Sequence, residues 1–265
     1  MYTLAQALEM RGFLVKDEGD YISFSKGNAR GEKQQLQQVL QDLEIPVRWE
    51  ENRLFMESPE VDIEKLHKII WFPARNHEAS GGNGWYGWKY FSRRKHGPKI
   101  NTFVLETGVA LLTKALSAAG IITISSCDGH GRKAPLIAFS GKHNGAWFQL
   151  LFQKQFRDVS FHYDWYLKNT DRDTVDLTVR IKNESWYLEK VLEDTWTMAR
   201  YFLENATVLS ETKRALFRSN YKTRRKIVRE MKFEELLQWM EERYVFLHES
   251  PEKHFNVRDA KMENR

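Results

Sequence analysis

The chain has 265 residues and a mass of 31.4 kDa, enough for one large domain or two modest ones with a substantial core. Hydrophobic residues make up 42% and charged residues 29%, which excludes a largely disordered chain, and no apolar run approaches the roughly 18 residues that cross a bilayer. The net charge is +5. The single cysteine, Cys127, is typical of a reducing compartment, so we expect a cytoplasmic protein. We expect no membrane association, because the sequence has no long apolar run.

The first 70 residues predict an α+β unit in the order helix, strand, strand, helix, strand, strand, helix. Leu4, Ala7 and Leu8 have helical spacing, whereas Val47 and Trp49 alternate as in a strand. Ser58 and Pro59 are the residue types that begin a helix. The expected elements are helix 3–11, strands 13–16 and 21–25, helix 31–43, a hairpin within 47–56, and a helix from 58 to about 70.

Residues 71–104 form a long connection that is rich in glycine, aromatic and basic residues. Connections of this length inside compact proteins are usually functional or disordered. Its basic and aromatic residues alternate along the sequence, which suits aromatic stacking on unpaired nucleobases together with phosphate contact. The alternative is that the aromatic residues simply anchor the loop to the core. The residues assigned to nucleic-acid binding here are Trp85, Trp88, Tyr90, Arg93, Arg94 and Lys95.

Residues 105–205 predict a second unit with the same order of elements. The expected elements are helix 105–119, strands 121–126 and 136–140, helix 144–156, strands 159–167 and 175–181, and helix 185–205. The opening helices match at a constant offset of 108, and later segments match at 115 and 114, which places seven extra residues in one loop of the second unit. This pattern predicts a pseudo-twofold internal duplication with its two sheets side by side.

The lengthened loop carries the densest run of reactive residues. Cys127 and His130 are candidate catalytic residues, as nucleophile and general acid or base, with Asp128 as an orienting or turn-forming residue. Gly129, Gly131 and Arg132 are candidate anion-binding residues, because glycines allow a ligand to approach the backbone. A buried structural cysteine and a common turn remain the alternative. One cysteine with scattered histidines is a weak zinc pattern, so no metal site is expected.

Residues 206–265 predict a basic helical tail. Nine basic residues lie between Lys213 and Lys232 against one acid, Glu230, which gives a local charge of +8. On a helix, four of them share one stripe, which is typical of a solvated helix face or of a phosphate-binding one. These four, Lys222, Arg225, Lys226 and Arg229, are assigned to nucleic-acid binding.

Two families resemble parts of the chain. The strand Thr123–Cys127 and its Gly/Arg turn resemble a Thr-Ser-Ser-Cys-Ser-Gly-Arg-like motif of the tRNA methyltransferases of wybutosine synthesis, with Asp128 in place of a serine and two residues inserted before Arg132. The resemblance covers about 30 residues and implies a ligand-binding role for Ser126, Cys127 and Arg132.

The order of elements also resembles that of LAGLIDADG homing endonucleases. In that family an acid ends each opening helix and holds the catalytic metal. Here those helices end in Arg11-Gly12 and Ala119-Gly120, without a carboxylate.

Together these features predict a nucleic-acid-binding protein, with RNA favoured over DNA, because the two basic stretches would attract a polyanion. An RNA-directed modifying or processing enzyme with its site at 125–132 is one form of this hypothesis. A noncatalytic DNA-binding saddle and a small-nucleotide-binding or sequestering protein are the alternatives. The cofactor, the substrate and the oligomeric state are unknown at this stage.

Overall fold

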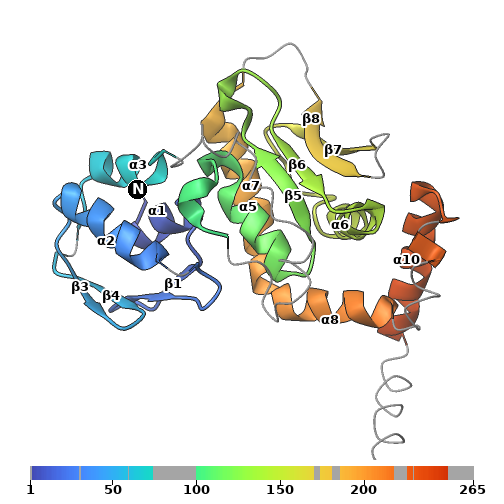
Figure 1. Cartoon of the computed structure of the whole chain (residues 1–265), viewed down its shortest axis with the longest axis horizontal. Helices are drawn as coiled ribbons and strands as arrows, with labels where there is room; N and C mark the ends of the chain where they lie inside the picture. The colour runs from blue at the N-terminus through green and yellow to red at the C-terminus, as the bar shows by residue number, and fades with distance from the viewer. Residues whose placement is uncertain are drawn as a thin grey trace, which may run out of the picture.

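The computed structural model describes residues 2–29, 31–58, 60–73, 100–169, 174–180, 186–217, 226–228 and 230–249, and the side chains of the last four residues are left out. They form a mixed α/β fold with two antiparallel sheets of four strands each (Figure 1). The predicted α+β class is therefore confirmed.

The first unit has the predicted order of elements. They are α1 (Leu4–Arg11), β1 (Val15–Asp17), β2 (Ile22–Phe24), α2 (Glu32–Asp42), β3 (Val47–Glu50), β4 (Arg53–Met56) and α3 (Ile63–Ile70). A capping box begins α1, because Thr3 and Gln6 each accept a hydrogen bond from the other's backbone N–H. The helix ends at Gly12, whose φ is +114° and where a Cβ atom would lie 2.6 Å from Cβ of Ala110.

The second unit repeats this order. Its elements are η1 (Thr102–Val104), α5 (Thr107–Ala118), β5 (Thr123–Cys127), η2 (Gly129–Gly131), β6 (Leu136–Phe139), α6 (Lys142–Gln155), β7 (Asp164–Asn169), β8 (Val175–Arg180) and α7 (Leu188–Glu204). The strand orders, β1-β2-β4-β3 and β5-β6-β8-β7, are the same in both sheets. A shared order is what the predicted duplication requires, while common descent of the two units stays a prediction.

Two predicted starts are wrong by five residues, and several other boundaries differ by two or three. The helix expected from Ser58 begins at Ile63, because the Asp62 side chain accepts a hydrogen bond from the Glu64 N–H and caps the helix there. The strand expected from Val159 begins at Asp164, because the backbone N–H groups of His162 and Tyr163 donate to the Asp194 carboxylate instead of to a strand partner.

Each unit buries one side of its sheet against helices. In the first sheet, Ile22 pairs with Leu54 and both are buried, so their neighbours at the next position face outward. In the second sheet, Ile137 and Leu177 face the core in the same way. In Figure 1, α5 and α7 cross the middle of the molecule between the two sheets.

The residues after α7 add to the second core. α8 (Ala206–Leu216) and α10 (Phe233–Glu249) contribute Leu209, Leu216, Leu236 and Met240 to the same buried cluster as α5 and α6. The described part of the predicted tail is thus packed on the second unit. Among the described residues, no helix is both long and apolar enough to cross a membrane.

Candidate functional site

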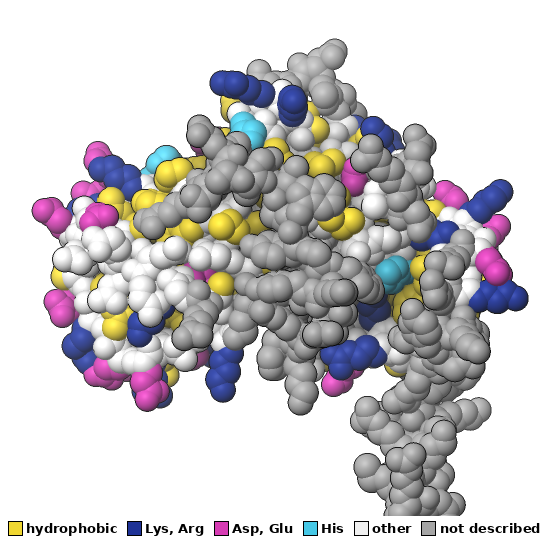
Figure 2. All heavy atoms as spheres, viewed as in Figure 1, with side chains coloured by type: hydrophobic (Ala, Val, Ile, Leu, Met, Phe, Trp, Pro, Cys, Tyr) yellow, Lys and Arg dark blue, Asp and Glu magenta, His cyan; other side chains and the backbone are white. Residues whose placement is uncertain are grey.

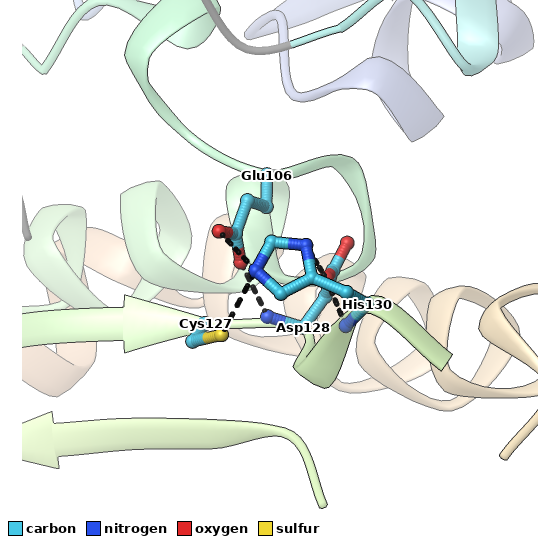
Figure 3. Close-up of side chains that lie close together, drawn as sticks. All are labelled: Glu106, Cys127, Asp128 and His130. Carbon is cyan, nitrogen blue, oxygen red and sulfur yellow. Dashed lines mark hydrogen bonds and ion pairs between the residues drawn. The ribbon is translucent and has the colours of Figure 1, made fainter. Parts of the chain in front are cut away.

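The turn after β5 has an unusual backbone. Gly129, His130 and Gly131 have φ values of +81°, +53° and +67°, so three consecutive residues occupy the left-handed region. A non-glycine residue in this region is uncommon and costs about 1 kcal/mol or more. His130 is held there by its own N–H, which donates to Oδ1 of Asp128 at 3.0 Å. This conformation turns the imidazole back toward the end of the strand (Figure 3).

The predicted catalytic residues Cys127, Asp128 and His130 lie together, and Glu106 joins them (Figure 3). Nε2 of His130 lies 3.1 Å from Oε1 of Glu106 and 3.7 Å from Sγ of Cys127. The second Glu106 oxygen, Oε2, accepts a hydrogen bond from the Asp128 N–H at 2.7 Å. The His130 side chain is 47% exposed whereas that of Glu106 is 9% exposed, so the cluster opens to solvent on the histidine side.

Glu106 was missed at the sequence level, although a signal for it exists. It occupies the N-cap position of α5, and β5 returns along that helix. A helix of 12 residues is about 18 Å long and a strand of 5 residues about 17 Å long, so the end of β5 comes back to the start of α5. Any acid at the start of that helix is therefore expected beside the Cys127 turn.

The electrostatics of the cluster do not favour an active thiolate. Burial raises the pKa of the Cys127 thiol to about 11, the Gly129 N–H opposes this, and the Glu106 and Asp128 carboxylates raise it further. A nucleophilic cysteine would need a nearby cation to lower its pKa. Cys127 is thus a protonated thiol at neutral pH, and its predicted catalytic role depends on a positive charge brought into the cluster.

The predicted anion-binding residues are partly engaged within the turn. The Gly129 N–H donates to Sγ of Cys127 at 3.3 Å, and the Arg132 N–H donates to the Gly129 carbonyl at 2.9 Å. The Arg132 side chain is exposed. Two carboxylates line the same space, so the cluster as described attracts cations more readily than anions. Anion binding by Gly129, Gly131 and Arg132 stays a prediction.

Most of the predicted phosphate-binding residues lie outside the described part of the chain. Lys226 is described: its side chain is exposed, and its Nζ lies 3.9 Å from Oε2 of Glu230. On the face shown in Figure 2, hydrophobic side chains gather over the middle, and Lys and Arg lie toward the edges together with Asp and Glu. The residues that fall outside are Trp85, Trp88, Tyr90, Arg93, Arg94, Lys95, Lys222, Arg225 and Arg229.

A groove between the two units does not contain the cluster. It has a volume of about 1130 Å³ and runs between the first unit, at α1 and β1, and the second unit, at α7 and α8. Its charged residues are of both signs, among them Glu9, Arg200 and Arg214. Trp196 on α7 links the two sides of the groove, because its indole N–H donates to Oε2 of Glu9 on α1 at 2.9 Å. The cluster of reactive residues and this groove are therefore separate features.

Comparisons of the chain with models of protein families, with curated proteins and with solved structures each found no match. Function must therefore be inferred from the residues and their geometry.

Proposed function

We propose that the chain binds nucleic acid on the outward faces of its two sheets, with RNA favoured over DNA. The strand registers define these faces, since residues paired across antiparallel strands point the same way. Arg48 pairs with Phe55 on the first sheet, and Tyr166 pairs with Thr178 on the second. The outward polar and aromatic residues are Lys16, Ser23, Arg48, Glu50, Arg53 and Phe55 on the first sheet and Ser125, Cys127, Asp164, Tyr166, Lys168, Asp176, Arg180 and the buried Thr178 on the second.

The observation that carries the proposal is a set of arginines stacked on aromatic rings on both outward faces. The guanidinium carbon lies 4.5 Å from the ring centroid for Arg48 over Phe55 and 4.8 Å for Arg180 over Tyr166. Arg53 lies 5.0 Å from the ring centroid of Tyr21, just before β2. A guanidinium held against a ring keeps its charge and its planar face available, which is the combination that stacks on unpaired bases and contacts phosphates.

The charges on these faces differ in how far they are neutralised. Arg48 contacts the Glu50 carboxylate, and Nε of Arg180 lies 3.8 Å from the Asp164 carboxylate. Within the described residues, Arg53 has no carboxylate in ion-pair distance. We therefore expect Arg53 and its partner Tyr21 to be the centre of the surface on the first sheet.

The test is binding of the full chain to a fluorescein-labelled single-stranded RNA, followed by fluorescence anisotropy at 50 and 200 mM salt. Affinity should fall steeply with salt, because each phosphate contact releases a counterion. Arg53→Gln should weaken binding about 5- to 30-fold, because it removes one charged and stacked contact worth about 1 to 2 kcal/mol.

The matched control is Arg243→Gln. Arg243 lies 5.1 Å from the Trp239 ring centroid, a similar stacked pair, but on α10 and not on a sheet face. An equal loss in both variants, or no loss for Arg53→Gln, would contradict the proposed surface. Tighter binding to duplex DNA would favour the DNA-binding alternative, and little dependence on salt would favour a small nucleotide.

An RNA-directed modifying or processing enzyme is the second candidate, and one observation favours it. Cys127 pairs with Leu136 and therefore points to the outward side of the second sheet, the side that carries Arg180 and Tyr166. A strand of RNA on that face would reach the Cys127 turn. Mass spectrometry of RNA incubated with the protein, with and without S-adenosylmethionine as a methyl donor, should then show a methylated or cleaved product that His130→Gln abolishes. The enzyme hypothesis fails if wild type leaves the RNA unchanged.

A further inference from the structure

The cluster of Glu106, Cys127 and His130 has the spacing of a metal site. In a tetrahedral zinc site the ligand atoms lie about 2.0 to 2.3 Å from the metal, and therefore roughly 3.3 to 3.7 Å from one another. The observed separation of 3.7 Å between Nε2 and the sulfur lies in this range, and that of 3.1 Å between Nε2 and the Glu106 oxygen is slightly shorter, so the two side chains would separate a little to admit the metal. All donor atoms of the cluster, including a carboxylate oxygen of Asp128, lie within 4.8 Å of one another.

We propose that Glu106, Cys127 and His130 bind one zinc ion, with Asp128 as the residue that orients the histidine. The binding is independent of the proposed nucleic-acid function. A thiolate sulfur, an imidazole nitrogen and a carboxylate oxygen are the mixed set that suits zinc, whereas magnesium and calcium prefer oxygen ligands alone. As the metal–sulfur bond forms, Cys127 loses its thiol proton to solvent.

The surroundings of each proposed ligand fit this role. The Gly129 N–H donates to the Cys127 sulfur, and the Asp128 N–H donates to Oε2 of Glu106, the oxygen other than the one that contacts His130. Oδ1 of Asp128 lies 3.7 Å from Nδ1 of His130, on the side of the ring away from the sulfur. Metal-binding histidines commonly direct their second nitrogen toward a carboxylate, which fixes the ring and its tautomer.

Solvent can reach the proposed site, and the fourth position of the metal is not filled by these three ligands. The His130 side chain is 47% exposed, so an ion can enter from that side. Three protein ligands with one open position are the arrangement of catalytic zinc sites, in which the fourth ligand is a water molecule. The site would then supply the cation that the predicted chemistry of the turn lacks.

The test uses the tag-free, metal-free full chain titrated with Co²⁺ and then with Zn²⁺. We expect one ion per chain, a sulfur-to-cobalt charge-transfer band, and loss of that band when zinc displaces cobalt. Cys127→Ser should abolish the band, and His130→Gln should weaken zinc binding more than the 10- to 100-fold loss typical of an orienting residue. Asp128→Asn should fall within that 10- to 100-fold range.

The matched control is His162→Gln. Nε2 of His162 lies 2.7 Å from the Glu193 carboxylate, an exposed histidine–carboxylate pair outside the cluster, and its loss should leave metal binding unchanged. Circular dichroism of each variant separates loss of metal from loss of fold. A wild-type titration without the charge-transfer band, or zinc binding that survives both Cys127→Ser and His130→Gln, would overturn the proposal and leave His130 and Glu106 as an ion pair of the turn.

Discussion

Lys213 shows how far one residue can depart from its apparent role. Its charge belongs to the nine basic residues that suggested a phosphate-binding tail, yet its side chain is buried where α8 meets the end of α5. Nζ donates to the Gly120 carbonyl at 2.7 Å and to Oδ1 of Asn144. A neutral amine has two N–H groups, which these two acceptors satisfy. Burial lowers the pKa of Lys213 to about 7.

This buried lysine predicts a stability that rises with pH. In the unfolded chain a lysine has a pKa of about 10.4, so between pH 7 and 10 the unfolded state binds more protons than the folded state, and stability increases with pH. Below pH 7 both states are protonated and the full cost of burying the charge is present. The slope cannot exceed ~1.4 kcal/mol per pH unit. We expect the difference in unfolding free energy between wild type and Lys213→Met, measured with urea at each pH, to grow in favour of wild type from pH 7 to 10.

A difference between wild type and Lys213→Met that does not change with pH would contradict the depressed pKa. Lys226→Met is the matched control, because Lys226 is an exposed lysine of the same basic stretch, and its removal should change stability by less than about 0.5 kcal/mol.

At the level of elements, local sequence signals predicted most of the fold. Apolar spacing located the helices, and alternation located the hairpins, because most elements bury one face, although α5 is buried on all sides. The boundaries that were predicted wrongly include those that depend on side chains distant in sequence. The start of β7 is set by Asp194, which lies on α7 and is about 30 residues away in sequence. Glu106 is a similar case, since only the return of β5 along α5 brings it to Cys127.

Asp194 therefore predicts a large local effect. Its carboxylate accepts from the backbone N–H of His162 at 2.8 Å, from that of Tyr163 at 3.1 Å, and from the Trp165 indole at 2.8 Å. Asp194→Ala leaves three donors without this acceptor. The Trp165 indole N–H is buried, and an unsatisfied buried group costs about 1 to 3 kcal/mol, whereas the half-buried N–H groups of His162 and Tyr163 can bind water instead. We expect a loss of about 2 kcal/mol in urea unfolding, together with a changed Trp165 emission. Asp164→Asn, at an exposed site on β7, should change stability by less than about 0.5 kcal/mol, and an equal effect of both variants would refute this role of Asp194.

At the scale of the whole molecule, buried polar groups join the two units. Nζ of Lys114 on α5 lies 3.1 Å from Oε1 of Glu32 on α2 and 2.7 Å from Oγ1 of Thr102. The same Glu32 oxygen accepts from the Thr102 N–H at 2.7 Å, and Nη1 of Arg11 donates to the Thr102 carbonyl at 3.1 Å. Arg11, the last residue of α1, is buried, and this hydrogen bond joins it to the second unit.

The Glu32 carboxylate favours the charged forms of Arg11 and Lys114, which burial disfavours. Burial lowers the pKa of Arg11 to about 10, and the Glu32 and Asp128 carboxylates oppose that shift. Burial also lowers the pKa of Lys114, and Glu32 opposes it both by its charge and by its hydrogen bond. The side chains of Lys114 and Glu32 are 2% and 1% exposed, so water cannot replace a lost partner. Nothing in the sequence distinguishes these three residues from surface charges, because their burial arises only when α1, α2 and α5 meet.

Glu32→Gln should therefore destabilise the contact between the two units more than it destabilises the fold of either unit. Removing one partner of a buried ion pair typically costs about 3 to 5 kcal/mol, because the remaining charge stays buried and unpaired. Glu50→Gln is the matched control, since Glu50 pairs with Arg48 at an exposed site and its loss should cost less than about 1 kcal/mol.

Urea unfolding should be followed by circular dichroism and by tryptophan emission, because Trp49 lies in the first unit and Trp165 in the second. If the network couples the units, the two probes coincide in wild type and separate in Glu32→Gln. Coincident curves in both proteins, with a small loss of stability, would show that the units are held together by their apolar contacts instead.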